Sequence, residues 1–166
     1  RELLRLSGSV RMLYNPLVGM PSQGTLLAID YGKARTGLAV GHPLTGSAQP
    51  LEPLPSKNED LLLEGLSKAI KTWRPGVLVV GLPLGADGLD SPMSEVVRAF
   101  ADKVKQAHPE LELVFQDERL TSVEAASRHQ KRREQGRARA KDAAKLDSVA
   151  AALILESWMS GYVETS

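Results

Sequence analysis

Apolar residues fall into short runs that are separated by glycine, proline and polar residues. The first run covers 25–31 and the second covers 36–42, with Gly32 between them and Gly37 near the start of the second. Glycine permits a tight reversal of the backbone, so these runs predict two strands of a β-hairpin. A third run, 46–55, contains three prolines and is typical of an edge strand, because proline cannot donate a hydrogen bond to a neighbour.

The rest of the pattern alternates between helix and strand. Apolar residues recur at helical spacing after Asn58 and after Ser91, two residue types that cap helices. Continuous apolar runs bounded by turn-forming residues predict buried strands between these helices. The expected elements are a helix over 58–73, a strand over 76–82, a helix over 91–108, a strand over 111–116, a helix from Thr121 or Ser122 toward Gly136, and a last helix over about 143–159.

This order predicts an α/β domain. Three consecutive strands form a meander, and the later strands alternate with helices, which favours parallel crossovers. We therefore expect a five-stranded mixed sheet flanked by helices, with the strand 76–82 in a central, parallel position. Residues 24–166 are expected to form a single domain, and residues 1–23 an extension with little regular structure.

Composition narrows the class of protein. The chain has 166 residues, enough for one ordinary domain, with 42% hydrophobic and 25% charged residues. It contains no cysteine, which excludes disulfides and thiolate chemistry and fits a reducing compartment. No apolar run approaches the roughly 18–20 residues of a membrane helix, and no signal peptide is visible. We expect a cytoplasmic protein.

The net charge of +1 conceals a strongly basic segment near the C-terminus. Between 128 and 145, eight basic residues stand against only two acids, Glu134 and Asp142. The basic residues are Arg128, Lys131, Arg132, Arg133, Arg137, Arg139, Lys141 and Lys145. Such a density favours an anionic partner over an ordinary solvated surface.

Acidic residues stand at the ends of the predicted elements. Asp30 ends the first strand, Asp117 and Glu118 end the last strand, and Asp147 lies in the first turns of the last helix. The carboxyl ends of parallel strands meet at one edge of a sheet, where open α/β sheets bind their ligands. Neighbouring carboxylates repel one another, and a bound divalent cation removes this conflict.

Oxygen-only ligands suit Mg²⁺ or Mn²⁺. Two such ions can hold the attacking water and the leaving oxygen of a phosphodiester, so that no serine, cysteine or histidine nucleophile is required. The three histidines show no metal-ligand spacing. The pattern therefore favours metal-assisted hydrolysis of nucleic acid.

Each acid also has a structural explanation. Asp30 could cap its own turn, Asp147 could interact with a helix dipole, and Asp117 with Glu118 could cap the following helix. Alternation along the strand does not choose between Asp117 and Glu118, since adjacent residues point to opposite faces.

Four segments in series resemble the RuvX/YqgF family, over about residues 25–162. They are Leu26-Leu27-Ala28-Ile29-Asp30-Tyr31-Gly32 with Thr36-Gly37-Leu38-Ala39-Val40, then Val79-Val80-Gly81-Leu82-Pro83-Leu84, then Asp117-Glu118-Arg119-Leu120-Thr121-Ser122, and finally Lys145-Leu146-Asp147-Ser148-Val149-Ala150-Ala151. The resemblance implies a ribonuclease H-like fold and either Holliday-junction resolution or maturation of the 5′ end of pre-16S rRNA. It also implies that Asp30, Glu118 (rather than Asp117) and Asp147 are the catalytic metal ligands.

The expected partner is nucleic acid. Lys33, Arg35 and Arg119 would contact its backbone together with Lys131, Arg132, Arg133, Arg137, Arg139, Lys141 and Lys145, although Arg119 could equally form a structural pair. Symmetric cleavage of a four-way junction would favour a homodimer, whereas trimming an RNA end would not. Two alternatives remain at this stage: a phosphate- or ATP-binding protein of the actin/sugar-kinase type, and a non-enzymatic RNA-binding factor of ribosome assembly.

Overall fold

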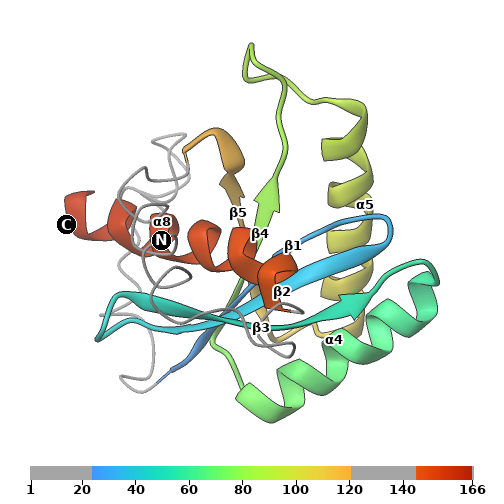
Figure 1. Cartoon of the computed structure of the whole chain (residues 1–166), viewed down its shortest axis with the longest axis horizontal. Helices are drawn as coiled ribbons and strands as arrows, with labels where there is room; N and C mark the ends of the chain where they lie inside the picture. Colours follow the sequence, from blue (N-terminus) through green and yellow to red (C-terminus); the bar gives the residue numbers. More distant parts are fainter. Residues whose placement is uncertain (1–23, 121–144, 166) are drawn as a thin grey trace.

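The computed structural model describes residues 24–120 and 145–165, and shows a mixed sheet between helices (Figure 1). The extension 1–23, the helix expected after Thr121 and most of the basic segment lie outside the described residues. The elements are β1 (Leu26–Asp30), β2 (Arg35–His42), β3 (Ser47–Pro55), α4 (Glu59–Trp73), β4 (Val77–Leu82), α5 (Pro92–Ala107), β5 (Glu112–Asp117), the 3-10 turns η1 (Glu118–Leu120) and η2 (Lys145–Ser148), and α8 (Val149–Thr165).

The sheet has five strands in the order β3-β2-β1-β4-β5. β2 runs antiparallel to both β1 and β3, whereas β4 runs parallel to β1 and β5. The predicted meander followed by parallel strands is therefore confirmed, with β3 at an edge. All six residues of β4 are buried, as expected for a central strand.

Helices cover both faces of the sheet (Figure 1). α4 and α5 pack on one face, where alternate strand residues such as Leu27, Ile29 and Val80 join their apolar side chains. α8 packs on the other face against Ala28 and Val79. The sheet thus separates two apolar layers, and strand alternation decides which layer each side chain enters.

The predicted helix starts of the first layer are confirmed. Asn58 Oδ1 accepts a hydrogen bond from the Leu61 N–H at 3.1 Å and caps α4. Ser91 and Ser94 form a reciprocal capping box at the start of α5. These caps satisfy N–H groups that have no partner inside the helix.

The last helix differs from its prediction at both ends. A 3-10 turn, η2, takes up Lys145–Ser148, and α8 begins only at Val149 and continues to Thr165. The reason for the late start is a close approach to β2: a Cβ on Gly37 would lie 2.5 Å from the Asp147 carbonyl oxygen. Asp147 therefore lies in a separate turn beside the sheet, just before α8. Within the described residues, no helix has the length and apolar character needed to cross a membrane.

Candidate active site at the carboxyl edge of the sheet

Two of the predicted acidic side chains meet across β4. Ala28 packs in the α8 layer, so Asp30, two residues later, points to that same face. Val114 of β5 packs against the same layer, so Asp117 points by alternation to the other face. The Glu118 side chain, which follows in η1, lies over Gly81 beside Ile154 of α8. The assignment that alternation alone left open is therefore decided by the position of α8.

Glycine in β4 makes this meeting possible. β4 separates β1 from β5, and Gly81 lies at its carboxyl end. A Cβ at this position would come within 2.8 Å of Glu118 Oε1 and would also collide with Ile154 of α8. The Glu118 side chain can therefore pass over Gly81 toward Asp30 only because no side chain stands between them.

The two carboxyl groups are hydrogen-bonded to each other. Burial is the largest cause that raises the pKa of Glu118, and together with the hydrogen bond to Asp30 and the negative charges of Asp30 and Asp117 it brings this pKa to about 8. Burial also raises the pKa of Asp30, while its hydrogen bond with Glu118 acts in the opposite direction. At neutral pH the pair therefore holds a proton between two oxygens, which is how close carboxyls avoid a double charge.

Asp147 lies one strand away from this pair. Its backbone packs on Gly37, which is the cross-strand partner of Asp30. Ser148 fixes the turn further, since its Oγ accepts a hydrogen bond from the Leu38 N–H at 2.9 Å. The Asp147 side chain is paired with Arg35, whose Nε lies 2.6 Å from Oδ2.

Asp117 has a different partner from Glu118. Both of its carboxylate oxygens accept hydrogen bonds from Arg119, at 2.6–3.1 Å. The same guanidinium donates to the Ala86 carbonyl at 3.3 Å and lies against Gly88, so that Arg119 connects the end of β5 with the loop between β4 and α5. In this structure Arg119 forms the structural pair, and its phosphate contact stays a prediction.

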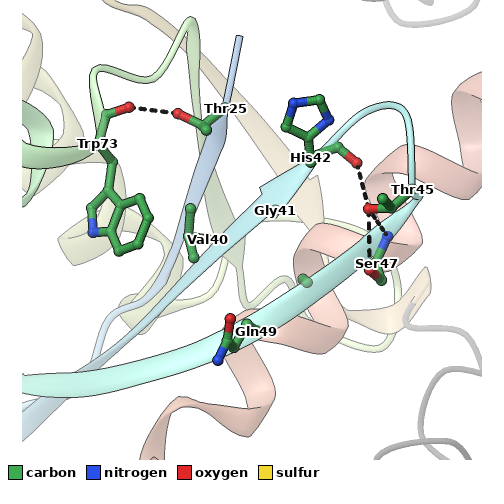
Figure 2. A pocket seen from close by; sticks show the side chains of 9 residues that line it. Thr25, Val40, Gly41, His42, Thr45, Ser47, Gln49 and Trp73 are labelled. Atoms are coloured by element: carbon green, nitrogen blue, oxygen red, sulfur yellow. Dashed lines mark hydrogen bonds between the residues drawn. The ribbon is translucent and has the colours of Figure 1, made fainter. Parts of the chain in front are cut away.

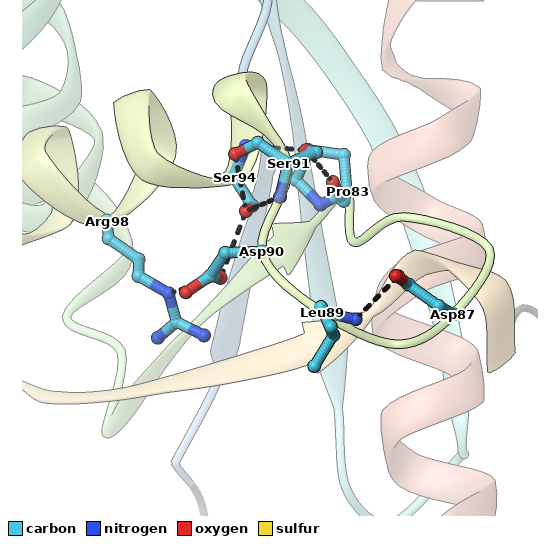
Figure 3. A network of polar contacts seen from close by, with 7 residues as sticks. All are labelled: Pro83, Asp87, Leu89, Asp90, Ser91, Ser94 and Arg98. Carbon is cyan, nitrogen blue, oxygen red and sulfur yellow. Dashed lines mark hydrogen bonds and ion pairs between the residues drawn. The ribbon is translucent and has the colours of Figure 1, made fainter.

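The loop that Arg119 contacts is held by several hydrogen bonds (Figure 3). Asp87 Oδ1 accepts from the Leu89 N–H at 3.0 Å, and Ser91 Oγ donates to the Pro83 carbonyl at 2.6 Å. Asp90 accepts from Ser94 and from Arg98, each at 3.0 Å, and the Arg98 hydrogen bond is the main reason for its lowered pKa. The loop beside the acids therefore has a defined conformation.

A separate pocket lies at the other end of the strands (Figure 2). Its volume is about 470 Å³, and it is lined by residues such as Thr25 before β1, His42 at the end of β2 and Trp73 at the end of α4. None of the described residues that line it is a carboxylate. The acids and this pocket therefore belong to different regions of the molecule.

Two of the three predicted carboxylate ligands are arranged so that they could hold a hard cation. Asp30 and Glu118 offer oxygens that a divalent ion could take in place of their shared proton. Asp147 would join them only if Arg35 left it. Within residues 24–120 and 145–165, no three acidic or histidine side chains form a group that could hold a metal ion, so the three-carboxylate site stays a prediction.

The predicted nucleic-acid contacts are only partly described. Lys33 and Arg35 lie exposed on the hairpin between β1 and β2, and Lys145 is the first residue of η2. The others lie outside the described residues: Lys131, Arg132, Arg133, Arg137, Arg139 and Lys141. The structure adds Gly81 and Gly37, whose roles the sequence pattern did not reveal.

A family model and individual relatives of known sequence match most of this chain. The family model described as "RuvX: Holliday junction resolvase" matches residues 24–161. A protein of Nitrosospira multiformis named "Putative pre-16S rRNA nuclease" is 40% identical over 138 residues, covering 83% of this chain and 89% of that protein. A protein of the same name from Escherichia coli O157:H7 is 39% identical over 140 residues, covering 84% of this chain and 99% of that protein.

Solved structures support the fold. The yeast mitochondrial Holliday junction resolvase superimposes with a TM-score of 0.51 at 13% identity, covering 98% of this chain and 87% of that one. At this identity the likeness concerns the fold alone. Together with the observed sheet, it confirms the predicted ribonuclease H-like class.

The proton held by Glu118 predicts how stability depends on pH. Its pKa is about 8 in the folded protein and near 4.5 when unfolded, so the folded state binds more protons between these values. Stability of the metal-free protein should therefore fall as pH rises from about 4.5 to 8. Glu118→Gln, which is neutral at every pH, should remove much of this slope and be more stable above pH 8 by on the order of 1 kcal/mol.

The measurement is urea unfolding in EDTA at several pH values. Asp102→Asn, on the exposed side of α5, is the matched control and should retain the wild-type slope. Equal slopes for wild type and Glu118→Gln would show that Glu118 does not carry the proton.

Proposed function

This chain belongs to the RuvX family, and we propose that it is a nuclease that hydrolyses phosphodiester bonds of structured nucleic acid with Mg²⁺ or Mn²⁺. The observation that carries the proposal is the Asp30–Glu118 carboxyl pair over Gly81. Two carboxyls that share a proton are poised to exchange it for a divalent cation, because the ion removes the same electrostatic repulsion.

Asp30, Glu118 and Asp147 are proposed as the residues that hold the cations. A bound divalent ion lowers the pKa of water and neutralises charge that develops at phosphorus. The protein itself supplies the fixed geometry: β1 positions Asp30, η1 directly after β5 positions Glu118, and the contact of η2 with Gly37 positions Asp147. Glu118 must lose its proton before it can serve as a ligand.

Backbone phosphates would be held by the exposed cations. Lys33 and Arg35 lie exposed on the hairpin that follows Asp30, and Arg35 is paired with Asp147. Basic residues of the segment 131–145 extend this set. Such contacts give salt-dependent affinity with little sequence preference. The low aromatic content, 4%, argues against base stacking as the main source of affinity.

The first test is Asp30→Asn. Loss of one carboxylate should reduce metal-dependent cleavage by about a hundredfold or more, because the ion is then held by fewer charges. Folding, and affinity for nucleic acid measured in EDTA, should change little, since the cations on the hairpin are untouched. Cleavage of a labelled substrate and filter binding measure the two properties.

Asp102→Asn serves again as the control and should cleave as wild type does. Full activity of Asp30→Asn, or wild-type activity in EDTA, would refute the metal-dependent mechanism. Sub-millimolar binding of Mg-ATP would support the actin/sugar-kinase alternative. Loss of function only on removal of the basic residues would support a non-enzymatic RNA-binding factor.

We propose that the precursor of 16S rRNA is the preferred substrate. The relatives that are about 40% identical carry that substrate in their names, whereas the resolvase structure is 13% identical. A side-by-side assay with a pre-16S fragment and a mobile four-way junction, with Mg²⁺ and with Mn²⁺, should show faster cleavage of the RNA. Paired symmetric cuts in the junction, together with a dimer in solution, would instead identify a resolvase.

A further inference from the structure

Arg35 forms an ion pair with Asp147, which the proposed function needs as a metal ligand. It is the first residue of β2, and its Nε donates to Asp147 Oδ2 at 2.6 Å. Both side chains are largely open to solvent, with 60% of Arg35 and 46% of Asp147 exposed. Exposed ion pairs of this kind contribute little to stability and exchange partners readily.

The backbone at both ends of this ion pair is held in place. In the hairpin turn, Ser56 Oγ donates to the Gly32 carbonyl at 2.6 Å, and the Ser56 N–H donates to Ala34 at 3.0 Å. On the other side, the Asp147 backbone packs against Gly37. A change of partner by Arg35 therefore requires rotation of its side chain alone, with no movement of β2 or η2.

The Arg35 guanidinium places its positive charge on Asp147, where a bound divalent cation would also place positive charge. Gly37, on which Asp147 packs, is paired in the sheet with Asp30, the partner of Glu118. Arg35 neutralises Asp147 at this position, beside the strand end that carries Asp30.

We propose that Arg35 is a placeholder for the divalent cation: it neutralises Asp147 in the metal-free protein, leaves when the ion binds, and is then free to bind a backbone phosphate. A guanidinium suits both steps, because its planar donors match carboxylate and phosphate oxygens equally well. The proposal rests on the proposed function, in which Asp147 is a metal ligand. It would couple metal binding to the capture of nucleic acid.

Lys33 provides the matched control. It is exposed on the same hairpin turn and carries the same charge, and in the described part of the chain it forms no ion pair. A general electrostatic effect of the hairpin would make Lys33 and Arg35 equivalent. A placeholder role would distinguish them.

The direct test follows the Arg35 Nε–H signal by ¹⁵N NMR during titration with Mg²⁺, with the signal assigned by its loss in Arg35→Lys. Saturating Mg²⁺ should move the signal to the position found in Asp147→Asn, where the ion pair is absent. An Nε–H signal that stays at its metal-free position while Mg²⁺ binds would overturn the proposal.

Metal affinity gives an independent readout. Arg35→Gln should bind Mn²⁺ about three- to fivefold more tightly than wild type, because the ion no longer competes with the guanidinium, whereas Lys33→Gln should change affinity less than about twofold. Arg35→Lys, which keeps the charge, should return the affinity toward the wild-type value. Equal effects of Arg35→Gln and Lys33→Gln would contradict the placeholder role.

The phosphate step is tested by filter binding of a pre-16S fragment. Arg35→Gln should weaken binding about three- to fivefold with Ca²⁺ present, but less than about twofold in EDTA, where wild-type Arg35 is held by Asp147. Lys33→Gln should weaken binding equally in both conditions. Equal losses for Arg35→Gln in both conditions would overturn the proposal but leave metal-dependent cleavage intact. Absence of any Mn²⁺ binding by wild type would remove both proposals.

Discussion

The carboxyl pair formed by Asp30 and Glu118 is the interaction on which the proposed chemistry depends. Bringing two acids together at the half-buried edge of a sheet is unfavourable unless a proton or a cation joins them. The fold nevertheless enforces this arrangement, because strand alternation points Asp30 to the α8 face, η1 brings Glu118 over Gly81, and Gly81 leaves the space between the two side chains open. The raised pKa of Glu118 is the physical sign of this constraint.

Small residues on the α8 face explain how the rest of the site is assembled. Gly37 allows the Asp147 backbone to touch β2, and Gly81 allows both Ile154 and Glu118 to lie over β4. Side chains at these positions would push α8 and η2 away from the sheet. The same close packing that buries α8 therefore positions Asp147 at the edge of the sheet where Asp30 lies.

Much of the fold could be predicted from the sequence, for local reasons. Continuous apolar runs, prolines at an edge strand and the caps Asn58 and Ser91 are signals that act over a few residues, and the sheet and helix starts follow them. The start of α8 could not be predicted in this way. It depends on the contact of η2 with Gly37, which is more than one hundred residues away in the chain.

The sequence predicted which residue types form the site, but it predicted less well which acidic and basic side chains contact each other. The positions of Asp30 and Glu118 at strand ends were informative, yet the choice between Glu118 and Asp117 needed the position of α8, and the engagement of Asp117 by Arg119 needed the β4–α5 loop. Arg35 was expected to contact nucleic acid, but its partner in this structure is Asp147. The positive charge of Arg35 predicts an anionic partner, but only the three-dimensional structure shows that this partner is Asp147.

The central claim, that a divalent cation takes the place of a proton between Asp30 and Glu118, is tested most directly by calorimetric titration with Mn²⁺ at pH 7 in buffers of different ionisation enthalpy. The account predicts that binding to the wild-type protein releases close to one proton, because the Glu118 pKa of about 8 keeps this side chain mainly protonated before the ion arrives. Binding that releases no proton, or no binding at millimolar Mn²⁺, would contradict it.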